Sequence, residues 1–205
     1  MSTSKECYEC GLHRFRKNQV VGAGDIPASI LFVGEAPGRS EDLRAKPFVG
    51  PSGKLLRDAM KKAARLLEVS VLPSYYITNV VQCRPTDSLG GPNRQPTDDE
   101  IWACRPNFEA VLNQVKPGVV VFIGKVAEHA LKKRFFGAHT LVHPAYILRK
   151  GGQSSSEFVK FVRELSVVLQ EGLHYEEARK AARRRIRTGA GRGNSKHVKY
   201  MDEMP

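Results

Sequence analysis

Short apolar runs alternate with longer segments of helical periodicity along this chain. Four runs rich in β-branched and aromatic residues are typical of buried strands: Ser29–Val33, Tyr75–Val81, Val119–Ile123 and the shorter Thr140–His143. The segments between and after them carry apolar residues at helical spacing or begin with capping residues. They predict helices over Gly53–Leu67, from the Thr97–Glu100 capping box to Val115, over Val126–Lys133, and from Ser154–Glu157 onward.

Strands that alternate with helices form a parallel sheet covered by helices on both faces, so the pattern predicts an α/β fold. In such sheets ligands bind beyond the carboxyl ends of the strands. The segments that follow the predicted strands are therefore candidates for a site: Gly34–Gly38, Asn79–Cys83, Gly124 and His143–Pro144.

Charge narrows the class of partner. The chain has 205 residues, of which 41% are hydrophobic, and this is enough for one globular domain with a core. Its 33 Lys and Arg exceed its 21 Asp and Glu, which gives a formal net charge of +12. A basic surface binds polyanions because it releases counterions from around phosphates. Charge alone does not separate DNA, RNA and an acidic membrane.

The composition changes near residue 174. We divide the chain into a domain of residues 1–173 and a basic C-terminal tail, 174–205, which we expect to be helical at first and then disordered. No apolar run approaches the roughly 20 residues that span a bilayer, and the N-terminus lacks the apolar core of a signal peptide. We therefore expect a cytoplasmic, nucleoid-associated protein with no membrane partner.

Four cysteines are candidates for a metal site. Cys7 and Cys10 form a C-x-x-C motif, Cys83 follows the second predicted strand, and Cys104 lies in the next helix. In a reducing compartment such cysteines are more often metal ligands or free thiols than disulfides. Four thiolates hold either zinc or a [4Fe–4S] cluster, and the residue types alone do not separate the two. The alternative, that Cys83 and Cys104 are small core residues, is one we rank below a metal site.

Two glycine-rich segments surround the candidate pocket. Gly34–Gly38 follows the first strand, where glycine lets the backbone approach a ligand closely, although an ordinary turn has the same composition. The segment Lys46–Gly53 looks like a phosphate loop before a helix. A Walker A motif ending at Gly53–Lys54 requires glycine where Phe48 stands, so we exclude nucleotide hydrolysis by this loop.

Together these segments resemble the family 4 uracil-DNA glycosylases, the iron–sulfur branch of the uracil-DNA glycosylase superfamily. The resemblance covers roughly residues 5–170, and it rests on CYEC, GEAPG, Glu41, KPFVGPSG, YYITNVVQCRP, NRQPTDDEIWACRP, VVVFIG and HPAYILR, in the expected order. It implies a three-layer α/β/α fold with a central four-stranded parallel sheet. It also implies that Cys7, Cys10, Cys83 and Cys104 bind a largely structural [4Fe–4S] cluster.

The resemblance implies an activity: hydrolysis of the bond between uracil and deoxyribose in DNA, which leaves an abasic site for base excision repair. Phe48 would stack on the flipped base and the Asn79 amide would bind the uracil edge, with the Ala36 backbone nearby. Glu41 would lie near C5 of the base, where it would crowd a thymine methyl group. Each has a simpler alternative: a core phenylalanine, a strand-end cap and a solvated carboxylate.

Two residues would carry the chemistry. Glu35 lies beside the sugar in the family, where a carboxylate orients water or stabilises positive charge. His143 lies against O2 of the leaving base, where a donor stabilises the uracil anion as an oxyanion hole does. A histidine bonded within the core and a carboxylate bonded within its loop are the alternatives.

The remaining expectations concern DNA. Ser52 and Lys54 would contact DNA, and Tyr146–Arg149 would form a loop that wedges into the space vacated by the base. We expect a monomer that acts on single- or double-stranded DNA and a basic tail that binds DNA or a protein.

Three features depart from the family pattern: the longer Asp87–Gly91 segment, Ala145 where serine is usual, and the basic tail. The longer Asp87–Gly91 segment contains no histidine that could attack the sugar, so we expect no covalent trapping of uracil-DNA. The alternatives left open are a glycosylase for another modified or deaminated base, a non-catalytic module that binds DNA or a protein, and a scaffold stabilised by zinc.

Overall fold

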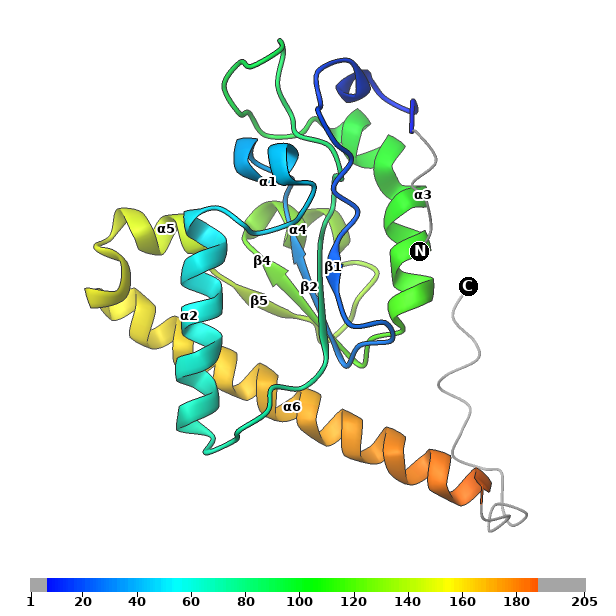
Figure 1. The fold of residues 1–205 in the computed structure, drawn as a ribbon, viewed down its shortest axis with the longest axis vertical. Helices are drawn as coiled ribbons and strands as arrows, with labels where there is room; N and C mark the ends of the chain where they lie inside the picture. Colours follow the sequence, from blue (N-terminus) through cyan, green and yellow to red (C-terminus); the bar gives the residue numbers. More distant parts are fainter. Residues whose placement is uncertain (1–6, 188–205) are drawn as a thin grey trace.

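A five-stranded sheet lies at the centre of the computed structural model, which describes residues 7–187 (Figure 1). The strands follow the order β1-β3-β2-β4-β5. Their bounds are Ala23–Gly24 for β1, Ile30–Gly34 for β2, Tyr75–Asn79 for β3, Val119–Ile123 for β4 and His139–Leu141 for β5. The last four pair in parallel, which confirms the predicted parallel sheet. The fifth, β1, pairs antiparallel with β3. It was not predicted, because a strand of two residues is too short to show a periodic pattern.

The main helices are α1 (Arg39–Arg44), α2 (Pro51–Leu66), α3 (Asp98–Val115), α4 (Lys125–Leu131), α5 (Pro144–Arg149) and α6 (Ser156–Arg187), with 3-10 turns η1 (Gly11–Arg14) and η2 (Gly152–Ser154). The predicted capping box is confirmed: the Thr97 hydroxyl accepts a hydrogen bond from the Glu100 N–H, and the Glu100 carboxylate accepts one from the Thr97 N–H. Helix α2 begins two residues earlier than predicted because Pro51 occupies its first turn, where a missing N–H costs nothing.

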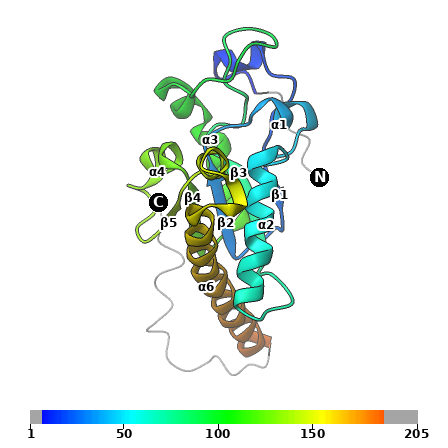
Figure 2. The same ribbon diagram turned by 90° about the vertical axis from the view of Figure 1, so that its left-hand side faces the viewer.

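Two apolar cores lie on opposite faces of the sheet. Alternation along β2 directs Ile30 and Phe32 toward α2, α5 and α6, and it directs Leu31 and Val33 toward α3 and α4. Figure 2 shows the sheet between these helices. The three-layer α/β/α arrangement is therefore confirmed.

Helix α6 runs through residue 173, the boundary that we expected between domain and tail. Its Glu176 carboxylate accepts a hydrogen bond from the Ser29 hydroxyl at 3.0 Å and is also bonded to Ser74. These bonds fasten α6 to the segments just before β2 and β3. The rest of the predicted tail, 188–205, lies outside the described residues. No helix in the described part of the chain is long and apolar enough to cross a membrane.

Candidate active site

A cavity of about 420 Å³ opens at the carboxyl ends of β2 and β3, the edge at which α/β sheets bind ligands. It is lined by most of the residues that the sequence singled out: Glu35, Ala36, Glu41, Phe48, Ser52, Asn79 and His143. Phe48, Asn79 and His143, which the resemblance assigned to the flipped base, thus line one common cavity.

Phe48 holds its position through an unusual backbone. Its backbone φ is +51°, a value that residues other than glycine rarely adopt. Its carbonyl accepts a hydrogen bond from Arg57 Nη1 at 2.7 Å. A Cβ at Gly53 would lie 1.6 Å from that carbonyl oxygen, so only glycine permits this turn. The ring is 7% exposed and belongs to the core on the α2 side while it also lines the cavity. The core and pocket interpretations of Phe48 therefore both hold.

Asn79 is the last residue of β3, and it pairs with Gly34 of β2. Its side chain is only 2% exposed, yet its amide makes no hydrogen bond with any other described residue. A Cβ at Gly34 would lie 2.4 Å from Asn79 Oδ1 and 2.8 Å from the Phe48 ring. Glycine at this position therefore brings the amide and the ring together, and the amide keeps a donor and an acceptor for a ligand.

His143 caps α5, and this fixes its tautomer. Its Nδ1 accepts a hydrogen bond from the Ala145 N–H at 3.1 Å, so in the neutral ring the proton is on Nε2. Burial, with a smaller effect from the positive charge of Arg149, lowers the pKa of His143 below its usual value. The ring centroid lies 6.3 Å from that of Phe48. The pocket thus contains a neutral imidazole with one N–H available as a donor.

The two acidic residues differ in their surroundings. Burial raises the pKa of Glu35, which is half-buried directly after β2. Glu41 Oε1 instead accepts a hydrogen bond from the Gly50 N–H at 2.8 Å. Glu41 therefore braces the turn that carries Phe48, and only its other oxygen is left for a ligand.

One wall of the cavity is formed by Asn93 and Arg94, which belong to the loop of residues 85–96. The sequence analysis assigned no role to these two residues. Arg84 is 4% exposed and clasps this loop, because its Nε donates to Asn93 Oδ1 at 2.6 Å and its guanidinium also binds the Gly91 carbonyl. The Arg94 guanidinium donates to both oxygens of Glu100, at 2.8 and 2.6 Å. The NRQP segment carried part of the family resemblance and was the only sequence signal for this wall.

The expected DNA contacts fall into two groups. Ser52 lines the cavity, whereas Lys54 lies two residues further along α2, exposed and paired with Asp58 at 3.0 Å. The expectation that Tyr146–Arg149 form a loop is wrong, whereas their insertion into the space vacated by the base stays a prediction. These residues belong to helix α5, where Ile147 is fully buried, because Pro144 at the first helical position and the His143 cap start a helix there. Only Tyr146, Leu148 and Arg149 remain on its outer face.

The cysteines lie in a region rich in N–H donors beside α3. Arg16 Nη1 donates to Cys83 Sγ at 3.0 Å, and its Nη2 donates to the Cys7 carbonyl at 3.0 Å. The Asn107 amide lies 3.4 Å from Cys7 Sγ and 4.0 Å from Cys104 Sγ. Cys7, Cys83 and Cys104 are thus distant in the sequence, yet the sulfur of each lies within hydrogen-bonding distance of Arg16 or Asn107.

Cys10 belongs to the same group, since it packs against the core cluster that contains Cys83 and Cys104. Burial raises the pKa of Cys104 to about 12 despite a hydrogen bond from the Gln82 N–H at 3.3 Å. Such buried thiols stay protonated unless a cation offsets the thiolate charge. Among residues 7–187, however, no three His, Cys, Asp or Glu side chains form a group that fits one metal ion.

Comparison with known proteins agrees with this site. The model of the uracil DNA glycosylase superfamily matches residues 21–166. The chain is 39% identical to a type-4 uracil-DNA glycosylase of Saccharolobus solfataricus over 130 residues, which are 63% of this chain and 56% of that protein. It is 38% identical over 154 residues to the type-4 enzyme of Sulfurisphaera tokodaii, covering 75% and 59% of the two chains. It is 41% identical over 121 residues to that of Archaeoglobus fulgidus, covering 59% and 56%.

The matched segments span somewhat more than half the length of these relatives. The superfamily match includes every predicted pocket residue and two of the four cysteines, Cys83 and Cys104. The resemblance noted from the motifs is thereby confirmed, and the chain belongs to the uracil-DNA glycosylase superfamily.

Proposed function

We propose that this protein hydrolyses the N-glycosidic bond between uracil and deoxyribose in DNA and leaves an abasic site. One observation carries the proposal: an aromatic ring, an unpartnered amide and a neutral histidine line the same cavity. The type-4 uracil-DNA glycosylases to which the chain is similar support it.

Binding begins with extrusion of the nucleotide from the stack, at a cost of a few kcal/mol. Phe48 offsets part of this cost, because stacking of a base on an aromatic ring contributes about 1–3 kcal/mol. Asn79 donates to and accepts from the edge of the base, and its burial makes a mismatched edge costly, since the buried amide would be left without partners.

Cleavage breaks the bond between C1′ and the base nitrogen, and the bonding electrons leave with the base. Positive charge develops on the sugar and negative charge on O2 of uracil. His143 donates Nε2–H to O2 and remains a neutral donor, because its Nδ1 is held by the Ala145 N–H. A donor of this kind stabilises a transition state by about 2.7–4 kcal/mol.

Water then adds to C1′, and the proton that it loses ends on the uracil anion, so that neutral uracil leaves. The Glu35 carboxylate lines the cavity and makes no hydrogen bond with any described residue, so it is available to orient this water or to stabilise the sugar cation. Glu41 holds the Phe48 turn through Gly50, and its remaining oxygen is the group that would crowd the methyl group of thymine, as the family resemblance implies.

The four cysteines fit a [4Fe–4S] cluster better than a single zinc ion. A cluster binds each thiolate through a different iron and therefore accepts ligands that stand further apart than around one ion. N–H groups of Arg16, Gln82 and Asn107 point at the sulfurs, which suits sulfurs that carry negative charge. When bound, the cluster supplies cross-links between the N-terminal segment, the end of β3 and α3.

A second candidate is excision of another modified or deaminated base. It is favoured by the 85–96 loop, which contains the unusually long segment and brings Asn93 and Arg94 to the cavity. Asn93 can offer its amide N–H₂ to a ligand, because its Oδ1 is held by Arg84, whereas the Arg94 guanidinium already donates to Asp87, Gln95 and Glu100.

The test is a glycosylase assay on duplexes and single strands that carry one modified base each. Anaerobically purified protein should convert uracil-DNA into alkali-labile abasic DNA, and it should contain iron and absorb visible light. Cleavage of another base but not uracil would establish the second candidate. Tight binding without any cleavage would leave only a DNA-binding module, and a colourless protein containing zinc would exclude the cluster.

A further inference from the structure

The projecting end of α6 is the most strongly charged part of the chain. Nine of the 33 Lys and Arg, and none of the 21 Asp and Glu, lie between residues 178 and 201. This segment therefore carries most of the net charge of +12. Six of these basic residues lie on α6, and we call the five whose side chains the structure describes the α6 basic end: Arg179, Lys180, Arg183, Arg184 and Arg185.

Packing does not explain this end of the helix. The face of α6 that packs in the core extends from Phe158 to Leu169, and Gly172 is still buried against Ile30 and Pro73. From residue 180 to 185 every side chain is exposed. Like charges also stand four residues apart there, for example on Arg179 and Arg183, which disfavours an isolated helix. A bound polyanion would relieve this repulsion.

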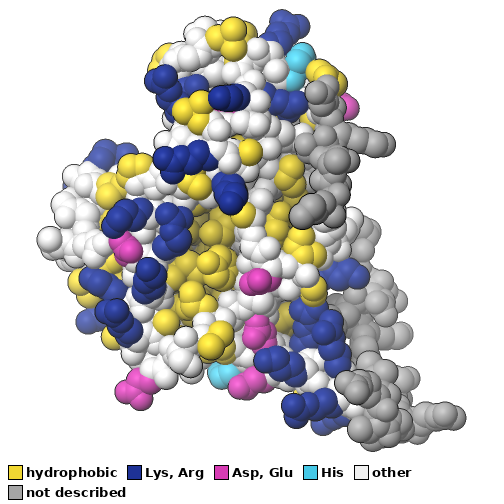
Figure 3. Space-filling model, viewed as in Figure 1, with side chains coloured by type: hydrophobic (Ala, Val, Ile, Leu, Met, Phe, Trp, Pro, Cys, Tyr) yellow, Lys and Arg dark blue, Asp and Glu magenta, His cyan; other side chains and the backbone are white. Residues whose placement is uncertain are grey.

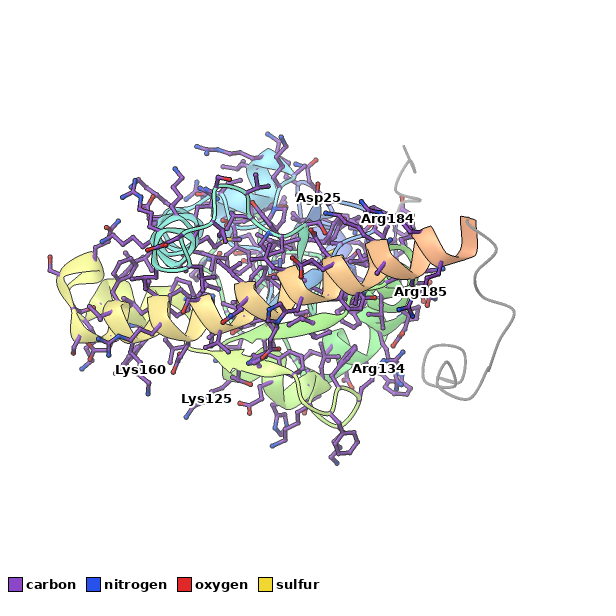
Figure 4. All side chains as sticks on the ribbon, turned by 90° about the horizontal axis from the view of Figure 1, so that it is seen from below. Asp25, Lys125, Arg134, Lys160, Arg184 and Arg185 are labelled. Carbon is purple, nitrogen blue, oxygen red and sulfur yellow. The ribbon has the colours of Figure 1, made fainter. Side chains whose placement is uncertain are left out.

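The α6 basic end is remote from the cavity. Helix α6 begins beside η2 and α5, close to His143, and at a rise of 1.5 Å per residue Arg183 lies about 40 Å further along the axis from Ser156. Figure 1 shows the helix leaving the sheet on the side away from α1 and α5. In the view from below, Arg184 and Arg185 lie at the projecting end of α6 while Lys160 lies near its other end (Figure 4). Lys and Arg gather over this projecting end in the space-filling view (Figure 3).

We propose that the α6 basic end binds the phosphate backbone of a second DNA segment, separate from the one whose base enters the cavity. Phosphates suit this run of guanidinium and ammonium groups, which has no acidic residue from 178 to 187 and borders Glu176 and Glu177 at its start. A membrane surface suits it less, because interfacial helices carry large apolar residues opposite the charges, and between residues 178 and 185 the apolar residues are Ala178, Ala181 and Ala182. The distance of about 40 Å equals about 12 base pairs, so the few nucleotides around the flipped base do not reach this end.

The test compares two double variants of the full chain, each of which removes two exposed charges from α6. Lys180→Gln with Arg183→Gln changes the basic end, and Lys160→Gln with Arg163→Gln is the matched control on the first half of the helix. Glutamine keeps the helix propensity of both. The probes are an undamaged duplex of about 40 base pairs, titrated at several salt concentrations, and a single-stranded pentanucleotide with a central uracil.

We expect the basic-end variant to bind the undamaged duplex about tenfold more weakly and to lower the slope of log K against log salt by about 2. Cleavage of the pentanucleotide by this variant should stay unchanged. An unchanged slope, an equal change in the control variant, or an equal loss on the pentanucleotide would each overturn the proposal. The proposal rests on the proposed function in one respect only: it takes the DNA whose base enters the cavity to be a different segment. The duplex used in the titration contains no uracil. Binding by the α6 basic end and cleavage of uracil-DNA are therefore tested separately, and either can fail without the other.

Discussion

Replacing His143 with asparagine or with alanine separates the two hydrogen bonds that this side chain is placed to make. Its Nδ1 accepts the Ala145 N–H and caps α5, and its Nε2–H is left to donate into the cavity. An asparagine oxygen is a good N-cap acceptor but ends short of the Nε2 position, so it keeps the cap and removes the donor. Alanine removes both.

The two losses differ in size and in the quantity that reports them. Loss of a donor to a developing anion lowers a rate by about 10²–10³, and loss of an N-cap costs about 1 kcal/mol of folding free energy. Both variants should therefore cleave uracil-DNA about 10²–10³ more slowly in single turnovers, with little change in DNA affinity. Alanine alone should lower Tm, by about 2–4 °C for a chain of this size. If the asparagine variant cleaves as fast as the unaltered protein, His143 does not stabilise the leaving base. Equal losses in rate and affinity would contradict the role as well.

The same residue predicts the pH dependence. The proposed mechanism needs His143 neutral and Glu35 ionised, and acidification removes both conditions. Burial lowers the pKa of His143 and raises that of Glu35, so cleavage should be flat near neutral pH and fall only below about 6.5. Arg149→Gln removes a positive charge that opposes protonation of His143, so the pKa of His143 rises and the acid limb should move to higher pH. A limb that does not move would belong to Glu35 instead.

Two further substitutions probe the cavity floor and the cysteine region. Gly34→Ala introduces a Cβ that would lie 2.4 Å from Asn79 Oδ1 and 2.8 Å from the Phe48 ring. Overpacking of this kind costs about 1–3 kcal/mol, and here it displaces the two side chains that bind the base. Cleavage should therefore fall about tenfold to a hundredfold, while the circular dichroism spectrum stays that of the folded protein. Arg16→Gln removes the charged donor to Cys83 Sγ, so the visible absorbance of anaerobically purified protein should fade faster in air.

Each of these has a matched control on the same chain. A Cβ at Gly11 meets nothing within 4 Å, so Gly11→Ala should cleave normally. Arg14 is exposed and makes none of the sulfur contacts of Arg16, so Arg14→Gln should fade at the rate of the unaltered protein. Normal cleavage by Gly34→Ala would mean that the two side chains do not bind the base. Equal fading of the two arginine variants would exclude a specific role for Arg16.

The sequence predicted what depends on short-range pattern. Short runs of β-branched and aromatic residues located the four parallel strands, and the Thr97–Glu100 spacing located the start of α3. It failed where tertiary packing decides. The family resemblance led us to expect a loop at Tyr146–Arg149, but burial of Ile147 and the His143 cap make this stretch a helix. The wall formed by Asn93 and Arg94 was likewise missed, because the contacts that place it, to Arg84 and Glu100, leave no periodic trace in the sequence.

The segment after β3 explains why a set of cysteines and a base pocket occur together in one fold. Asn79 ends the strand, Cys83 follows four residues later, and the intervening backbone is fixed by a hydrogen bond from the Val81 N–H to the Glu35 carbonyl at 3.1 Å. Arg84 then holds the 85–96 loop, whose Asn93 and Arg94 form another wall of the cavity. Displacement of Cys83 would therefore act on both walls at once, through Asn79 on one side and Arg84 on the other. A group that binds the four sulfurs has no need to touch the substrate in order to influence cleavage, because it fixes the one segment on which both walls depend.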